Sequence, residues 1–231
     1  MEILLIAAEW IGVVAFAISG AMVGVRKNFD LFGVMLLSVI TSFGGGIIRD
    51  LLLGHIPPRF FTNYGSVLTA VIASLIVFLF FSFFQDEEGK KHNLVMGIMN
   101  LFDAIGLAAF TVTGCGYAFQ AGYESKWLLV ISVGVITGIG GGMLRDTMAG
   151  EPQGVLRKHV YALAAIEGAV IYYLWTLYFP AKEWATPVSM LVIILVRLAA
   201  AHFKWNLPKI STIRRLRGIQ TESGEAKEKR D

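Results

Sequence analysis

The same unusual phrase occurs twice in this chain: three glycines, two apolar residues, an arginine and an aspartate. The first copy comprises residues 44–50 and the second residues 140–146. Each glycine weakens a helix by about 1 kcal/mol relative to alanine, and an ionisable side chain inside a membrane costs more. Because both copies interrupt long apolar segments at matched positions, the phrase indicates a polar pathway through a membrane.

The two glycine triplets allow two interpretations. Residues Gly44, Gly45 and Gly46, and again Gly140, Gly141 and Gly142, could kink or unwind their helices. The freed carbonyls and the negative end of the first half-helix would then favour a cation. Alternatively, the glycines only let two helices approach closely, because small residues also recur at spacing four before each triplet. Both uses can coexist on different faces of one helix.

The charged pairs Arg49–Asp50 and Arg145–Asp146 close the two phrases. Near a helix end, an arginine can extend to the membrane interface and pair with the aspartate. Alternatively, the arginines face the interior, where they set the electric field or hold a lipid phosphate. Since Arg145 is close in sequence to Arg157 and Lys158, we expect an anionic head group at that face of the membrane.

Glu9 and Asp103 are the deepest carboxylates in the apolar segments, and they occupy the same position in the repeat. A carboxylate inside a membrane is a candidate functional group, and it can line a pathway or pair with Arg49 or Arg145. Hydroxyl groups such as those of Ser42 and Thr137 could line the same pathway. Most such hydroxyls are expected to bond the carbonyl four residues earlier in their own helix.

Composition assigns these residues to a membrane protein. Of the 231 residues, 55% are hydrophobic and 16% are charged, and the mean hydropathy is +0.64. Apolar runs of about 20 residues are long enough to cross the hydrocarbon core as helices. We expect an all-α fold with seven spans, at residues 3–25, 31–53, 66–84, 94–119, 127–149, 159–179 and 185–203. Segments of alternating polarity typical of a β-barrel are absent from the sequence.

An internal repeat organises the seven spans. Glu9 and Asp103 are 94 positions apart, as are Gly20 and Gly114, and the glycine phrases are 96 apart. We therefore expect a first three-helix repeat (1–84), a cytoplasmic linker (85–93), a second repeat (94–179), a seventh helix (180–203) and a charged cytoplasmic tail (204–231). Since three spans are an odd number, the second repeat is expected to enter the membrane inverted.

Basic residues predict the orientation. The first, third and fifth loops and the C-terminal tail carry most of the lysines and arginines, whereas the other loops contain Arg59, Lys126 and Lys182. The positive-inside rule then places the N-terminus outside and the C-terminus in the cytoplasm. Cys115 is the only cysteine, which excludes an intrachain disulfide, and it is expected to be a buried packing residue.

The sequence lacks the motifs of several other classes of protein. It contains no phosphate-binding loop, dinucleotide fingerprint, zinc motif or nucleophile elbow, so we expect neither an enzyme nor a bound cofactor. A role in nucleic-acid binding is not expected either.

At the doubled glycine phrase, at Ser19-Gly20 and Thr113-Gly114, and at the Gly150-Glu151-Pro152 turn, the chain resembles the prokaryotic TRIC family, the trimeric intracellular cation channels. This family was formerly an uncharacterised group of bacterial inner-membrane proteins, and its domain has also been labelled a glycine transporter. The resemblance covers about residues 3–203. It implies seven helices, a homotrimer, and a monovalent-cation pathway through each protomer, with helices two and five kinked at their glycines. The permeant ions it implies are potassium or sodium, with potassium favoured.

One departure from the family concerns regulation. Animal relatives have a basic residue beside the helix-two and helix-five glycines, where this chain has Phe43 and Ile139. The sequence therefore gives no support for the calcium and phosphoinositide regulation of the animal proteins. The leading interpretation is a potassium-permeable channel, and the alternative is a small-solute transporter, for example for glycine, working by alternating access.

Overall fold

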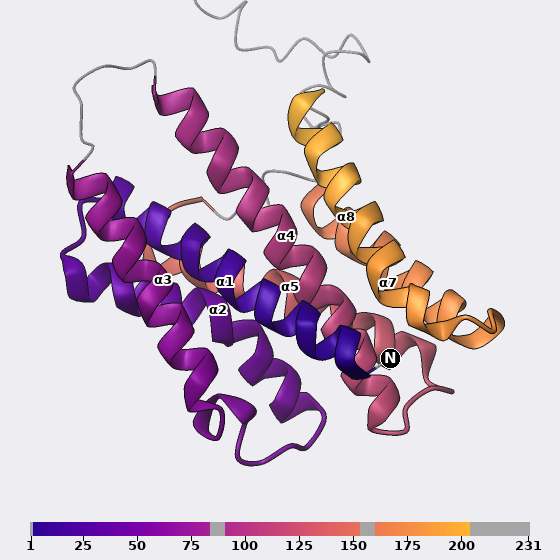
Figure 1. Cartoon of the computed structure of the whole chain (residues 1–231). Helices are drawn as coiled ribbons and strands as arrows, with labels where there is room; N and C mark the ends of the chain where they lie inside the picture. Colours follow the sequence, from indigo (N-terminus) through magenta and orange to yellow (C-terminus); the bar gives the residue numbers. More distant parts are fainter. Residues whose placement is uncertain (1, 84–90, 153–159, 204–231) are drawn as a thin grey trace, which may run out of the picture.

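The structure is a computed structural model that describes residues 2–83, 91–152 and 160–203. These residues form seven α-helices and two short 3-10 turns (Figure 1). The first three helices are α1 (Glu2–Arg26), α2 (Leu31–Leu52) and α3 (Tyr64–Phe83). They are followed by α4 (Lys91–Gln120), α5 (Trp127–Met148), α7 (Val160–Tyr178) and α8 (Ala185–His202), with the turns η1 (Arg59–Phe61) and η2 (Lys182–Trp184).

Six of the described helices are long and apolar enough to cross a membrane. They correspond to the expected spans one to five and seven. The expected span at 159–179 corresponds to α7, which has 19 residues and is not one of these six. The expected linker at 85–93 and tail at 204–231 lie largely or wholly outside the described residues.

Helices α2 and α5 begin and end for identifiable reasons. Asp30 caps α2, since its carboxylate accepts a hydrogen bond of 2.7 Å from the backbone N–H of Gly33. Both helices stop at a glycine with positive φ, Gly54 at 78° and Gly150 at 62°. The backbone N–H of the residue after the glycine donates to a backbone carbonyl oxygen of the helix, that of Asp50 in α2 and that of Asp146 in α5, each at 2.8 Å. This is the hydrogen-bonding pattern of a Schellman motif in both copies of the phrase.

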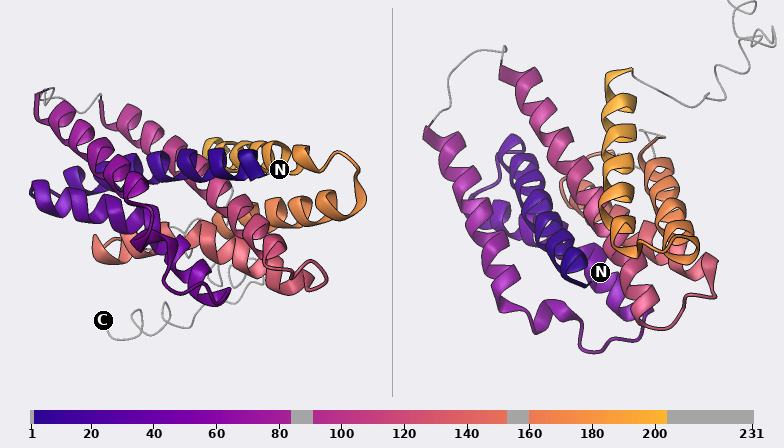
Figure 2. Two further views of the ribbon diagram at one scale, coloured as in Figure 1. Left: turned by 60° about the horizontal axis from the view of Figure 1, so that its bottom comes forward. Right: turned by 45° about the vertical axis from the view of Figure 1, so that its right-hand side comes forward.

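The helices pack in two groups that meet along α1, α2, α4 and α5. Helix α1 contacts α2, α3 and α4, and α5 contacts α2, α4 and α7 (Figures 1 and 2). Helix α3 lies at one side of the bundle, and only Ser66, Ala70 and Ser74 of it are buried. Helix α8 packs against α7 and α4 on the opposite side.

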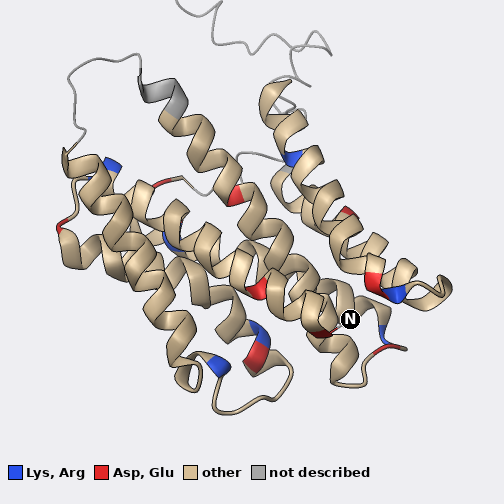
Figure 3. Cartoon of the chain, in the orientation of Figure 1, with Lys and Arg blue, Asp and Glu red and all other residues tan. Residues whose placement is uncertain are grey.

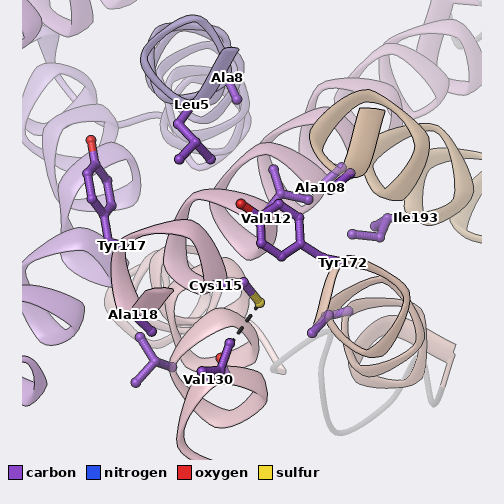
Figure 4. Packing of buried hydrophobic residues seen from close by; sticks show 14 of the residues in the cluster. Leu5, Ala8, Ala108, Val112, Cys115, Tyr117, Ala118, Val130, Tyr172 and Ile193 are labelled. Atoms are coloured by element: carbon purple, nitrogen blue, oxygen red, sulfur yellow. Dashed lines mark hydrogen bonds between the residues drawn. The ribbon is translucent and has the colours of Figure 1, made fainter. Parts of the chain in front are cut away.

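Apolar side chains fill most of the contacts between helices. The largest buried cluster joins α1, α4, α5, α7 and α8 and includes Leu107, Val112, Tyr172 and Ile193 (Figure 4). Cys115 is fully buried in it, as expected, and its thiol lies 3.6 Å from the carbonyl oxygen of Val130. Figure 3 shows that charged residues are few along the helices. The buried ones are therefore the starting point for a functional site.

Candidate functional site

Both glycine triplets lie within uninterrupted α-helix. Helix α2 continues from Leu31 to Leu52 and α5 from Trp127 to Met148. The expectation of a short unwound stretch at the glycines is therefore wrong for this structure. The physical reason is the close contact between α2 and α5. The glycines act there as packing residues, which is the alternative interpretation of the triplets.

The central glycine of each triplet makes that contact. A Cβ atom at Gly45 would overlap the carbonyl oxygen of Thr137, and a Cβ atom at Gly141 would overlap the carbonyl oxygen of Thr41. Thr41 and Thr137 are 96 positions apart, as are the two glycines. The two helices thus exchange the same contact. Because the later residue of one helix meets the earlier residue of the other, they run antiparallel at this point.

Helices α1 and α4 exchange a contact in the same way. Gly12 packs against the ring of Phe110, and Gly106 packs against the ring of Phe16. The two glycines are 94 positions apart, and so are the two phenylalanines. The two rings also contact each other, with centroids 5.2 Å apart. Reciprocal contacts of this kind are expected where a two-fold axis relates two equivalent units.

A first polar cluster, the Glu9 cluster, comprises Glu9, Arg49, Asp50, Arg59 and Tyr117. The Arg49 guanidinium is 1% exposed and donates to Asp50 at 2.9 Å and, more weakly, to Glu9 at 3.4 Å. The Tyr117 hydroxyl donates to the other Glu9 oxygen at 2.7 Å. Both arginines lie over the Tyr117 ring, with guanidinium carbons 4.2 Å and 3.7 Å from its centroid.

A small cavity of about 30 Å³ lies beside the Glu9 cluster. It is lined by Glu9, Ser42, Gly46, Arg49 and other residues, including the polar side chains of Asn63 and Ser66. The volume is enough for a water molecule, and the lining offers several hydrogen-bonding partners. A Cβ at Gly46 would meet only Arg49, at 3.8 Å. The third glycine of the first triplet therefore leaves space at the polar cluster.

A second polar cluster, the Asp103 cluster, comprises Asp103, Arg145, Asp146, Tyr161 and Arg197. Arg145 donates to Asp103 at 2.8 Å, to Asp146 at 2.9 Å, and to the hydroxyl of Ser19 at 2.6 Å. Arg197 donates to Asp103 at 3.4 Å, and its guanidinium carbon lies 4.4 Å from the centre of the Tyr161 ring.

The two clusters are built alike but differ in exposure. Each contains two arginines, two carboxylates and a tyrosine. One arginine of each cluster, Arg49 or Arg145, lies beside the third glycine of a triplet. In the first cluster the Glu9 side chain is 24% exposed, whereas the Asp103 side chain in the second is 8% exposed. A Cβ at Gly142 would meet the Tyr161 hydroxyl at 2.9 Å. The Asp103 cluster is therefore the more tightly closed of the two.

The hydroxyl groups of α2 and α5 donate either within their own helix or to a neighbouring helix. Thr137 donates to the carbonyl oxygen of Val133 in its own helix at 2.6 Å, and Thr41 donates in the same way to Leu37. Ser42 instead donates across to the carbonyl oxygen of Val13 in α1, at 3.1 Å. Of the two hydroxyls placed on the expected pathway, only that of Ser42 lines the cavity.

Four members of the clusters were not expected from the sequence: Arg59, Tyr117, Tyr161 and Arg197. Arg197 carried a usable signal, since it is an arginine within the apolar segment 185–203 and such residues face the interior of a bundle. The tyrosines carried none, because tyrosine is common near both membrane surfaces. Arg157 and Lys158, expected near a lipid head group, lie outside the described residues.

At the end of the bundle where α1 ends, a further ion pair connects the two halves. Arg26 at the end of α1 donates to Glu151 after α5 at 2.7 Å, and Lys27 approaches the same oxygen at 3.5 Å. The other side of the Arg26 guanidinium contacts the sulfur atoms of Met96 and Met99, at 2.9 Å and 3.3 Å.

Comparison with known proteins agrees with this organisation. A family model described as glycine transporter matches the chain twice, at residues 6–82 and 100–176, so the two matches are also 94 positions apart. The UPF0126 membrane protein YvgT of Bacillus subtilis is 38% identical over 87% of this chain and 94% of its own length.

Solved structures with the same fold include TRIC channels. A prokaryotic TRIC channel crystallised in 0.5 M KCl superposes with a TM-score of 0.80 at 36% identity, covering 90% of this chain and 100% of that one. The TRIC trimeric intracellular cation channel orthologue from Rhodobacter sphaeroides gives a TM-score of 0.78 at 31% identity, covering 87% and 98%.

Proposed function

This chain belongs to the prokaryotic TRIC family of multi-pass membrane proteins, and on that premise we propose that it is a cation channel. The proposal includes one permeation pathway in each protomer of a homotrimer, with potassium as the favoured ion. The solved relatives described as cation channels support the general function. The arrangement of the two polar clusters supports a pathway inside the protomer.

The proposed pathway runs along the α2–α5 contact from one cluster to the other. Gly46 leaves space at the Glu9 cluster and Gly142 packs against the Asp103 cluster, whereas Gly45 and Gly141 join the helices between them. A cation approaching the cavity meets the partly exposed Glu9 carboxylate, while Arg49 is held by Asp50 and Glu9. Local positive charge is thus neutralised by carboxylates within both clusters, which lowers the barrier to a cation.

We infer that the described state is closed along this pathway. Backbone contact at Gly45 and Gly141 leaves no room for an ion between α2 and α5. Conduction therefore requires these two helices to separate or bend at the triplets, and the low helix propensity of glycine makes such a change cheaper there than elsewhere in the helices. The kink inferred from the resemblance is accordingly proposed as a feature of the open state.

The topology proposed for this channel is an inverted repeat with the N-terminus outside the bacterial inner membrane. The reciprocal antiparallel contacts of α2 with α5 and of α1 with α4 support the inversion. The excess of lysine and arginine in the loops beside the end of α1 supports the orientation. Anionic lipids are proposed at that cytoplasmic face, with Arg157 and Lys158 as the contacts.

Planar bilayer recording of the purified full-length protein tests the function. We expect discrete single-channel currents whose reversal potential follows a potassium gradient and moves little with a chloride gradient. Lipid without protein, and protein unfolded by heat, serve as controls. Saturable uptake of labelled glycine into vesicles, without unitary currents, would overturn the channel in favour of a small-solute transporter.

A further inference from the structure

A second and larger cavity lies away from both polar clusters. It has a volume of about 480 Å³, which is in the range of small-ligand sites. Its walls come from the end of α4, the loop that follows it, the end of α7 and the turn η2. Figure 1 shows the α4–α5 and α7–α8 connections at the same end of the bundle. The proposed permeation pathway does not use this cavity.

Opposite charges border the cavity. Glu124 in the α4–α5 loop and Lys182 in η2 both line it, and both are exposed. Neither side chain forms an ion pair within the part of the chain that the structure describes. The cavity thus offers one carboxylate and one ammonium group that are available to a ligand carrying both signs of charge.

The rest of the lining holds this geometry and adds an apolar wall. The Tyr173 hydroxyl donates to the carbonyl oxygen of Glu124 at 2.9 Å, which ties the α4–α5 loop to α7. Trp175 donates to the carbonyl oxygen of Ala181 at 3.0 Å, which positions the turn before Lys182. The rings of Phe119 and Tyr173 pack together, with centroids 5.7 Å apart, and both line the cavity.

The position of the cavity points to lipid. Exposed aromatic residues surround this end of the bundle, including Trp127, Tyr178 and Trp184. Such residues are enriched where a protein meets the head-group region of a bilayer. Leu177 lines the cavity, and Leu174 is exposed about one turn earlier in α7, so an apolar surface continues from the cavity toward the hydrocarbon.

We propose that this cavity binds the zwitterionic head group of a phospholipid that carries a primary ammonium and a phosphate, as phosphatidylethanolamine does. Lys182 pairs with the phosphate, and Glu124 accepts hydrogen bonds from the ammonium group. The acyl chains lie along the apolar surface that begins at Leu177. A lipid with a phosphate but no ammonium group can pair with Lys182 but offers no ammonium group to Glu124.

Native mass spectrometry of the full-length protein in detergent tests this assignment with equal amounts of phosphatidylethanolamine and phosphatidylglycerol. We expect the wild type to retain phosphatidylethanolamine preferentially. Glu124→Gln should reduce that preference about two- to fivefold, the range for a partly exposed ion pair, without weakening phosphatidylglycerol binding. Lys182→Gln should weaken both lipids.

The chain offers matched controls next to the tested residues. Glu183→Gln and Lys126→Gln remove the same charges outside the cavity lining, and we expect both to leave lipid binding unchanged. Equal effects of control and cavity variants, or no lipid preference in the wild type, would overturn the site. Equal competition by free phosphoethanolamine would overturn the lipid as its occupant in favour of a soluble zwitterion. Because the readout is binding, it stands apart from the channel function.

Discussion

Gly45 packs directly against the backbone carbonyl of Thr137, and the equivalent pair, Gly141 and Thr41, makes the same contact in the reverse direction. Two helices can approach to backbone contact only where both lack a side chain at the crossing. The central glycines therefore fix the separation of α2 and α5. Any proposal for the pathway has to begin from this contact.

Replacing either central glycine by alanine should destabilise the protein. A methyl group at Gly45 or Gly141 has no space unless the helices move apart, and overpacking of this kind costs about 1–3 kcal/mol. Thermal unfolding of the detergent-solubilised protein measures the loss. Leucine at either position adds a larger side chain at the same contact and is expected to destabilise the protein further.

Gly97 provides the control for this substitution. It lies in α4, and a Cβ atom there would have no neighbour within 4 Å. Since alanine has the higher helix propensity, Gly97→Ala should leave stability unchanged or raise it by up to about 1 kcal/mol. Equal losses in all three alanine variants would show that the α2–α5 contact has no special role.

Removing the charge of Asp103 should cost more than removing the charge of Glu9. Asp103→Asn leaves Arg145 and Arg197 buried with one carboxylate fewer, and breaking a buried pair costs about 3–5 kcal/mol. Glu9→Gln removes a weaker contact of 3.4 Å at a partly exposed side chain, so about 1 kcal/mol is expected. Unfolding of both variants under identical conditions gives the difference, and an equal or reversed order would contradict the contrast in burial.

The helices and the repeat could be predicted because both depend on local sequence. Apolar runs predicted all seven helices to within a few residues, including the ends of α2 and α5 close to Gly54 and Gly150. The role of the triplets could not be decided, since consecutive glycines permit a break and a close contact equally well. The structure shows close packing of α2 against α5 at the central glycines, and that contact depends on tertiary packing.

Partners within the polar clusters were predictable only where the repeat placed them. The sequence offered Arg49 and Arg145 as possible partners of the two carboxylates, and the structure pairs Arg49 with Glu9 and Arg145 with Asp103. Tyr117 reaches Glu9 across 108 positions and Arg197 reaches Asp103 across 94, and neither has a counterpart in the other half. Residues that join a site without a counterpart in the repeat leave no periodic signal in the sequence.

Thr137→Val should leave conductance nearly unchanged. The hydroxyl of Thr137 is fully buried and donates to Val133 in its own helix, so it is not available to an ion in the closed state. Ser42→Ala should alter conductance, because Ser42 lines the cavity and fixes α2 to α1 through the carbonyl oxygen of Val13. Single-channel currents of the two variants test this, and a stronger effect of Thr137→Val would show that the pathway passes Thr137 when open.

The orientation of the chain can be tested with cysteine labelling, because the native thiol does not interfere. Cys115 is 0% exposed and should not react with a membrane-impermeant maleimide. Ser125 and Lys27 are exposed in loops at opposite ends of the spans, so each can carry a single new cysteine. If the N-terminus is outside, intact cells should label Ser125→Cys and spare Lys27→Cys, and permeabilised cells should label both. The unaltered chain is the control for background, and labelling of Lys27→Cys alone in intact cells would reverse the proposed topology.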